Sequence, residues 1–269
     1  MRLGFVQWPD GLMPNTDMWS AVAADVTRCA PQVLITNEMP FGPWLAASPN
    51  FDVALARTSV RIHEDGVQAL RALKVPIIIS SRPVIAGERL ANEAFILEHG
   101  CFRFLHQKHF FPAEEGWFET EWFRTSKPGF EVMEIDGLRI GALLCTELMF
   151  NERARAYGKS GAHLIAVPRA TGRSITPWKT AGAMAAIASG CYVVSSNRVG
   201  SSSAGPTFGG GAYSFAPDGS LLSESNEDCS IVIFELDKAL AEEQKSRYPV
   251  YVDEEISLIA PSTPMTDVG

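Results

Sequence analysis

Short apolar runs rich in β-branched residues alternate along the chain with longer segments whose apolar residues recur at helical spacing. Residues 52–73 are one such segment, because Val53, Val60, Val67 and Leu70 come close to one face of a helix. The alternation predicts an α/β fold. The expected strands are residues 2–8, 32–36, 75–80, 94–97, 101–105, 131–135, 138–144, 163–167, 191–196, 212–215 and 230–235, and the expected helices are residues 17–29, 52–73, 151–159, 177–189 and 238–245.

Two hairpins and one long loop interrupt this alternation near the middle of the chain. One hairpin is expected to turn at residues 98–100, and the second at Asp136-Gly137. The loop between them, residues 106–129, is rich in aromatic residues. Loops of this length in compact domains are typically functional.

No internal repeat or low-complexity linker divides the sequence. Its 269 residues suit one large domain or two ordinary ones. The unbroken α/β alternation favours a single domain over residues 1–269, in which residues 247–269, with prolines at 249, 261 and 264, form an extended C-terminal tail.

Composition narrows the possible partners and the expected compartment. A net charge of −8 argues against a surface that neutralises nucleic-acid phosphates or anionic lipid. We find no run of 18 apolar residues that would span a membrane, and the first residues do not resemble a secretory signal. The five dispersed cysteines are typical of free thiols. We therefore expect a cytoplasmic protein with a small-molecule ligand and no nucleic-acid or membrane partner.

Three residues with reactive side chains each follow a predicted strand. A thiol at Cys145 would lie on a strand-to-helix turn, where backbone N–H groups favour a thiolate and can bind an oxyanion. Apolar neighbours would adapt Glu38 to acid-base work, and Lys108 would supply a fixed positive charge. Taken singly, a buried apolar cysteine and two surface charges are the default interpretation. Taken together they indicate one site, because ligands gather at the carboxyl ends of strands in such sheets.

Six segments, in chain order, resemble the Glu-Lys-Cys signature of the nitrilase, or carbon-nitrogen hydrolase, superfamily. They are N-E-M-P-F at Glu38, H-Q-K-H-F at Lys108, L-L-C-T-E-L-M-F at Cys145, G-A-H-L-I-A-V-P at 161–168, Y-V-V-S-S-N at 192–197, and the stretch from G-G at 210–211 to P-D-G at 217–219. The resemblance implies a four-layer α-β-β-α sandwich, a homodimer or larger homo-oligomer, and a reaction that needs no metal or organic cofactor.

The resemblance also implies a second glutamate in the loop after the lysine, which would hold the lysine and the substrate amide by hydrogen bonds. Glu119, in E-T-E-W-F before Pro128-Gly129, matches that setting. Glu115, in E-G-W-F, remains an alternative because its distance from Lys108 along the chain does not exclude it.

The predicted substrate-binding residues come from the loops around this signature. They are Trp44, Glu115, Thr146, Arg169 and Trp178, with Trp117, Trp122 and Arg173 as further candidates. Thr146 stands where the family often has an aromatic residue, and Glu147 replaces its usual Asp. Leu148 and Met149 are apolar, so we do not expect this turn to bind a charged group of the substrate.

The implied reaction is hydrolysis of a small-molecule amide, with Glu38 as base and acid, Lys108 at the oxyanion and Cys145 as the acylated nucleophile. Nitrile hydrolysis and N-carbamoyl-amide hydrolysis use the same residues, and in the second case Arg169 or Arg173 would bind a substrate carboxylate. Three further hypotheses are a Cys-His pair with one of the five histidines, a zinc site at Cys101, His106 and His109, and a non-catalytic binding or scaffold protein.

Overall fold

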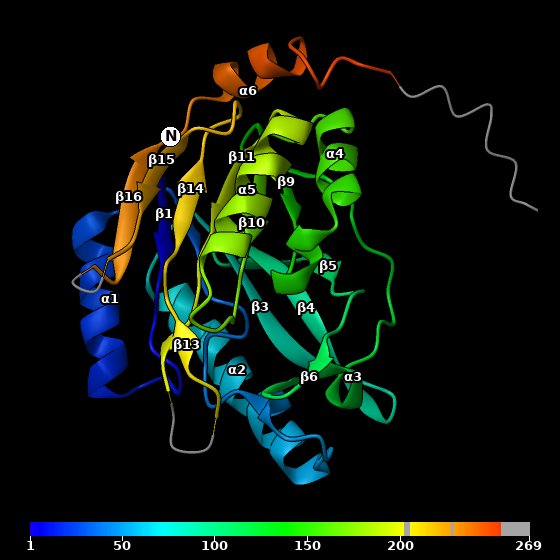
Figure 1. Cartoon of the computed structure of the whole chain (residues 1–269). Coiled ribbons are helices and arrows are strands. Elements are labelled where there is room, and N and C mark those ends of the chain that lie inside the picture. Colours follow the sequence, from blue (N-terminus) through cyan, green and yellow to red (C-terminus); the bar gives the residue numbers. More distant parts are fainter. Residues whose placement is uncertain (202–204, 227–228, 254–269) are drawn as a thin grey trace, which may run out of the picture.

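The first half of the chain and one late strand form a twisted six-stranded sheet (Figure 1). The computed structural model describes residues 1–201, 205–226 and 229–253. The three central strands of this sheet are parallel, and the outer pairings are antiparallel. Its order is β16 (Ile231–Glu235), β1 (Arg2–Val6), β2 (Val33–Ile35), β3 (Ile77–Ala86), β4 (Arg89–Glu98) and β5 (Cys101–Gln107).

The second half builds another six-stranded sheet with the same plan. Strands β9, β10 and β11 are parallel neighbours, and antiparallel strands flank them on both sides. The order is β15 (Leu221–Glu224), β14 (Tyr213–Phe215), β11 (Tyr192–Ser195), β10 (Leu164–Val167), β9 (Leu138–Ala142) and β8 (Met133–Ile135).

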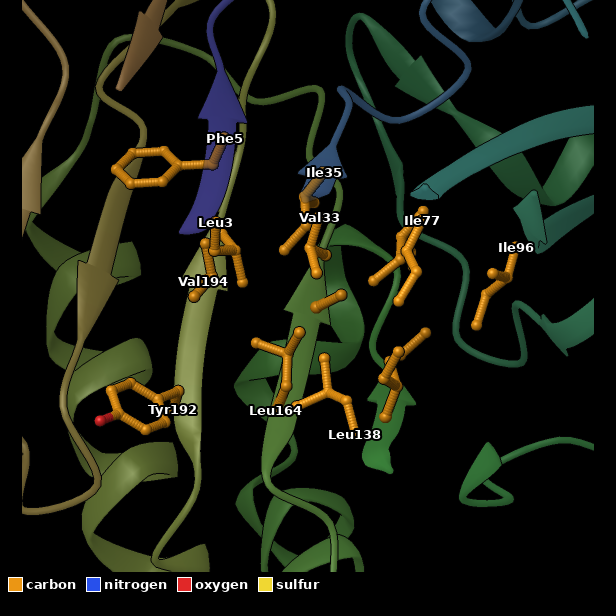
Figure 2. Close-up of a cluster of buried hydrophobic side chains, with 14 of the residues drawn as sticks. Leu3, Phe5, Val33, Ile35, Ile77, Ile96, Leu138, Leu164, Tyr192 and Val194 are labelled. Atoms are coloured by element: carbon orange, nitrogen blue, oxygen red, sulfur yellow. The ribbon is translucent and has the colours of Figure 1, made fainter. Parts of the chain in front are cut away.

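The two sheets pack face to face through alternate residues of their strands (Figure 2). Val33 and Ile35 of β2 face the inter-sheet core, where they share a cluster with Leu164 of β10, whereas Leu34 lies on the opposite face of its sheet. This period of two is what a strand imposes on its side chains. Because both faces of the central strands are largely buried, their sequences are mostly apolar.

Helices cover the outer face of each sheet. Helices α1 (Asp17–Cys29) and α2 (Val53–Ala72) pack on the first sheet, and α4 (Asn151–Lys159) and α5 (Thr176–Ser189) pack on the second. Helix α6 (Lys238–Lys245) follows β16 near one end of the sandwich (Figure 1). The order of layers is helix, sheet, sheet, helix, which confirms the predicted fold class. None of the described helices has the length and apolarity that crossing a bilayer requires.

Most predicted elements are present, and helices α1, α4 and α6 begin and end at the predicted residues. Strands β3 and β4 are longer than predicted, because buried polar residues such as Ser81 and Asn92 interrupt their apolar runs. Strand β15 was not predicted, and its residues are largely exposed.

The long loop has short elements of its own, and the C-terminal tail is described only in part. The loop contains β6 (Ala113–Glu114), β7 (Trp117–Phe118) and α3 (Glu119–Trp122). In the tail, the Val250 N–H donates to Arg247 O in a turn. Residues 254–269 of the predicted tail lie outside the described residues.

Candidate active site

Glu38, Lys108 and Cys145 lie just beyond strands β2, β5 and β9, all of which end on the same side of the sandwich. All three side chains are buried. Because the two sheets stack with the same plan, residues that are far apart in sequence meet at this edge. The structure thus brings the three predicted residues together.

The Lys108 ammonium is the centre of a buried cluster of charges. Its Nζ lies 2.8 Å from Glu38 Oε1, 2.9 Å from Glu119 Oε1 and 2.7 Å from Glu119 Oε2. All three side chains are fully buried. We call Glu38, Lys108 and Glu119 the ion cluster. Of the two glutamates left open by the sequence, Glu119 contacts the lysine, whereas Glu115 is exposed.

Burial and neighbouring charges set the protonation of the ion cluster. Burial alone would lower the pKa of Lys108, but the carboxylates of Glu119 and Glu38 outweigh it and raise that pKa well above its ordinary value. Burial raises the pKa of Glu119 to about 8, against the lowering effect of Lys108. Glu119 therefore binds a proton more readily than an exposed glutamate does.

Backbone and side-chain contacts fix the position of Glu38. The Asn92 Nδ2 donates to Glu38 Oε1 at 2.7 Å, and Asn92 O accepts from the Lys108 N–H at 2.9 Å. The Glu38 N–H donates to Arg169 O, and the buried guanidinium of Arg198 donates to Glu38 O at 3.2 Å. One carboxylate oxygen, Oε2, has no hydrogen-bond partner among the described residues. It is therefore able to accept a proton.

Cys145 begins a short 3₁₀ helix, η2 (Cys145–Met149), in a backbone conformation that is rare for residues other than glycine. Its φ is 53°, in the left-handed region. The Cys145 N–H donates to Pro168 O at 3.0 Å, which ties the turn to the end of β10. Burial raises the pKa of the thiol well above its ordinary value, with Glu38 adding to the effect and Lys108 opposing it. The resting thiol is therefore protonated and needs a base to become a nucleophile.

A pocket of about 270 Å³ opens onto the thiol. Trp117 and Trp178 supply apolar area to its lining, and Glu114 and Arg173 are charged residues within it. The remaining lining residues are Pro112, Cys145, Thr146, Ala170, Thr171, Gly172 and Ser174. The volume suits a small molecule.

The predicted substrate-binding residues divide into two groups. Thr146 and Trp178 line the pocket. Trp44, Glu115 and Arg169 are absent from its lining. Trp44 is buried and donates from Nε1 to Gly116 O at 3.1 Å.

Arg169 is buried, with its guanidinium hydrogen-bonded inside the protein. Its nitrogens donate to Ser195 Oγ at 2.5 Å, Thr171 Oγ1 at 3.1 Å and Gly211 O at 2.9 Å. Its placement does not support the predicted substrate contact. Arg173, the other candidate for such a contact, is exposed in the pocket lining.

Some residues of the site were not predicted. Asn92 was not among the predicted site residues. The polar pair Asn92-Glu93 inside an otherwise apolar strand indicates a buried polar site. Glu114 was not predicted either, because the sequence does not distinguish it from its neighbour Glu115. Trp122, a candidate for the pocket, is instead buried and donates from Nε1 to Ser48 O at 2.7 Å.

Another buried carboxylate, Glu147, lies beside the site. Its Oε2 accepts from His106 Nε2 at 2.8 Å, and its Oε1 accepts from the His109 N–H at 2.7 Å. We call Glu147, His106 and His109 the histidine cluster. These three side chains are close enough to hold a metal ion. In this structure the Glu147 oxygens accept hydrogen bonds from His106 Nε2 and from the backbone N–H groups of His109 and Leu144. Cys101, the other residue of the predicted zinc set, is exposed and is not part of the cluster.

Comparison with known proteins agrees with the predicted fold. A family model described as "Carbon-nitrogen hydrolase" matches residues 64–246. The structure of a carbon-nitrogen hydrolase from Helicobacter pylori G27 superposes with a TM-score of 0.84 at 21% identity, covering 96% of each chain. The solved structure shows that the fold is shared, and the family model covers more than half of this chain. The chain belongs to the carbon-nitrogen hydrolase family.

Two relatives carry more specific names. A chloroplastic omega-amidase from Arabidopsis thaliana is 27% identical over 188 residues, which is 67% of this chain and 51% of the relative. An N-carbamoylputrescine amidase from the same plant is 27% identical over 158 residues, 52% of this chain and 53% of the relative. These matches span about half the length of either relative.

Proposed function

We propose that this chain is an amidase that hydrolyses a small-molecule amide through a thioester on Cys145. The observation that carries this proposal is the ion cluster beside a buried thiol that lines a small pocket. The cluster combines a proton acceptor and a fixed cation next to a nucleophile, which are the groups that acyl transfer requires.

The first half of the reaction acylates the enzyme. The unpartnered Oε2 of Glu38 takes the thiol proton as the Cys145 sulfur forms a bond to the amide carbon. The Lys108 ammonium stabilises the oxyanion, for which a well-placed donor contributes about 3 kcal/mol. Glu38 returns the proton to the nitrogen as the carbon-nitrogen bond breaks, and the amine or ammonia leaves.

The second half releases the acid. Water gives a proton to Glu38 and attacks the thioester carbon, and the carbon-sulfur bond breaks as the thiolate regains that proton. Glu119, protonated at neutral pH and in contact with Lys108, keeps the ammonium in place through both halves. Glu38 thus accepts and returns a proton in each half of the reaction, which suits a carboxylate with one oxygen held and one free.

A second candidate function is hydrolysis of an N-carbamoyl amide, which would release carbon dioxide as well as ammonia. The observation in its favour is Arg173, an exposed cation in the pocket lining that makes no hydrogen bond or ion pair with the described residues. A guanidinium in that position can bind a substrate carboxylate. The match to a relative named N-carbamoylputrescine amidase supports the same reaction class.

The test measures ammonia and carbon dioxide release from a panel of aliphatic and aromatic amides, N-carbamoyl amino acids and nitriles, for the wild type and Cys145→Ala. We expect ammonia from at least one amide and a loss of kcat/KM of about 10⁴-fold or more in the variant, because the nucleophile is gone. Carbon dioxide release would select the second candidate. Undiminished turnover by Cys145→Ala would eliminate the thioester mechanism, and no turnover of any member would favour a binding protein.

A further inference from the structure

The Glu147 carboxylate receives three hydrogen bonds although it does not line the pocket. Its Oε2 accepts from His106 Nε2 and from the Leu144 N–H, both at 2.8 Å, and its Oε1 accepts from the His109 N–H at 2.7 Å. Glu147 and His106 are fully buried. All three partners donate N–H groups, so the carboxylate acts only as an acceptor.

These three bonds join the two segments that carry the lysine and the cysteine. Leu144 directly precedes Cys145, and His109 directly follows Lys108. Hydrogen bonds from these two backbone groups to one side chain fix the spacing between the end of β9 and the end of β5. The charge-assisted character of the bonds makes this link stiffer than one between neutral groups.

The imidazole of His106 is held in one tautomer. Its Nδ1 accepts from the Phe130 N–H at 3.2 Å, so the ring proton is on Nε2, where it donates to Glu147. Gly129 makes room for the ring, since a Cβ at that position would lie 2.3 Å from His106 Nδ1. The neutral ring therefore works as a fixed donor and acceptor.

The hydrogen bonds of Glu147 help to maintain the strained backbone conformation of Cys145. A non-glycine residue in the left-handed region costs about 1–2 kcal/mol and persists only where its surroundings impose it. Here Leu144, directly before Cys145, is held by Glu147 Oε2, and Cys145 itself is held by Pro168 O. Releasing the first of these contacts would let the thiol move relative to Lys108.

We propose that Glu147 and His106 are positioning residues: together they hold the thiol of Cys145 in reach of the ion cluster without taking part in proton transfer. The proposal rests on the proposed function for its effect on turnover. The geometry it describes has a second consequence that does not depend on the substrate, namely the rate at which an alkylating reagent modifies Cys145.

The test compares His106→Leu with His106→Gln. Gln at this position offers an amide N–H to Glu147 and an amide oxygen to the Phe130 N–H, which reproduces both contacts of the imidazole, whereas Leu offers neither. The readout is the rate constant of Cys145 alkylation by iodoacetamide from pH 6 to 9, followed by mass spectrometry of the Cys145 peptide because the chain has four other cysteines. Amide turnover gives kcat and KM for the same variants.

We expect His106→Leu to lower the alkylation rate and kcat by about 10- to 100-fold at every pH, with KM within about threefold of the wild type. His106→Gln should recover most of that loss. Glu147→Gln should resemble His106→Leu, because an amide nitrogen cannot accept from the N–H groups that face it.

Two results would overturn the proposal. If His106→Gln is as slow as His106→Leu and the pH profile shifts, then the imidazole acts as a base. If His106→Leu alkylates like the wild type, then the cluster does not hold the thiol. A wild type that turns over no amide, combined with alkylation that depends on His106, would reject the proposed function and leave the positioning role intact. Should Glu147→Gln not fold, the His106 pair still decides.

Discussion

Two buried carboxylate clusters flank Cys145, and they differ in what they can do with a proton. In the ion cluster, one ammonium contacts two carboxyl groups, and burial raises the pKa of Glu119 to about 8, so a proton can be gained or lost near neutral pH. In the histidine cluster, the Glu147 carboxylate accepts from His106 Nε2 and from two backbone N–H groups, and His106 has a fixed tautomer. The ion cluster can therefore exchange a proton during a reaction, whereas the histidine cluster can hold neighbouring groups in fixed positions.

The clusters also differ in how they connect the two sheets. The ion cluster is built from segments that follow β2 and β5 of the first sheet, together with Glu119 from the loop. In the histidine cluster, His106 belongs to β5 of the first sheet and Glu147 to the turn after β9 of the second. The proton-handling groups are thus organised within one half of the molecule, and the histidine cluster holds the nucleophile of the other half against them.

Removing the cation of the ion cluster should give the largest effect. Lys108→Met would leave the two glutamates without the charge that stabilises them, so we expect a loss of about 3–5 kcal/mol in the free energy of unfolding and at least about 10³-fold in kcat/KM. Urea denaturation and amide turnover measure the two losses.

The matched control removes a lysine from an exposed ion pair. Lys179 pairs with Glu224 at the surface, and such pairs contribute about 0–1 kcal/mol. Lys179→Met should therefore change stability by less than about 1 kcal/mol and leave turnover intact. Equal stability losses in the two lysine variants would show that the ion cluster is no more than another salt bridge.

The proton on Glu119 should appear in the pH dependence of stability. Its pKa rises from 4.5 in the unfolded chain to about 8 in the folded protein, so the folded state binds the extra proton between these values. The resulting stabilisation is complete below pH 4.5 and is lost as the pH rises toward 8, with a slope of up to about 1.4 kcal/mol per pH unit.

Replacing Glu119 by Gln tests this slope. Glu119→Gln should be less dependent on pH between 5 and 8 than the wild type, as measured by urea denaturation at each pH. The control is Glu115→Gln, since Glu115 is an exposed neighbour in the same loop and should leave the slope unchanged. Parallel curves for the wild type and Glu119→Gln would mean that the proton resides elsewhere.

The sequence predicts the sheets and helices well because their side-chain periods are local. Val33, Leu34 and Ile35 form an apolar run that suits a strand buried on both faces. The apolar pattern did not predict the full length of strands whose buried polar residues contact the site. Asn92 breaks the apolar run of β4 because its side-chain amide donates to Glu38.

The site residues that directly follow a strand were predictable from the sequence. The site residues whose positions depend on the path of a loop were not. Glu119 and Glu115 are four residues apart, and only the turn made by α3 determines which of them contacts Lys108. Arg169 and Arg173 are likewise separated by the path of a loop, which buries one and exposes the other. The bond from His106 to Glu147 spans 41 positions, and no local pattern marks it.

The smallest effect is expected from a single methyl group placed in the histidine cluster. A Cβ at Gly129 would lie 2.3 Å from His106 Nδ1 and 2.9 Å from His109 Cε1, so Gly129→Ala must displace one or both rings. We expect a loss of about 1–3 kcal/mol in stability and a decrease in kcat of about 3- to 10-fold, without any change in the charges of the site.

The pH dependence of stability separates the effects of the two clusters in Gly129→Ala. Its stability should keep the wild-type slope between pH 5 and 8, because the methyl group alters the geometry of the histidine cluster and not the proton held by the ion cluster. Gly100→Ala is the control: its Cβ meets no atom within 4 Å, but its φ of 81° makes alanine cost about 1–2 kcal/mol at a turn outside both clusters. If Gly100→Ala slows turnover as much as Gly129→Ala, general destabilisation explains both. If Gly129→Ala flattens the slope, the two clusters act as one.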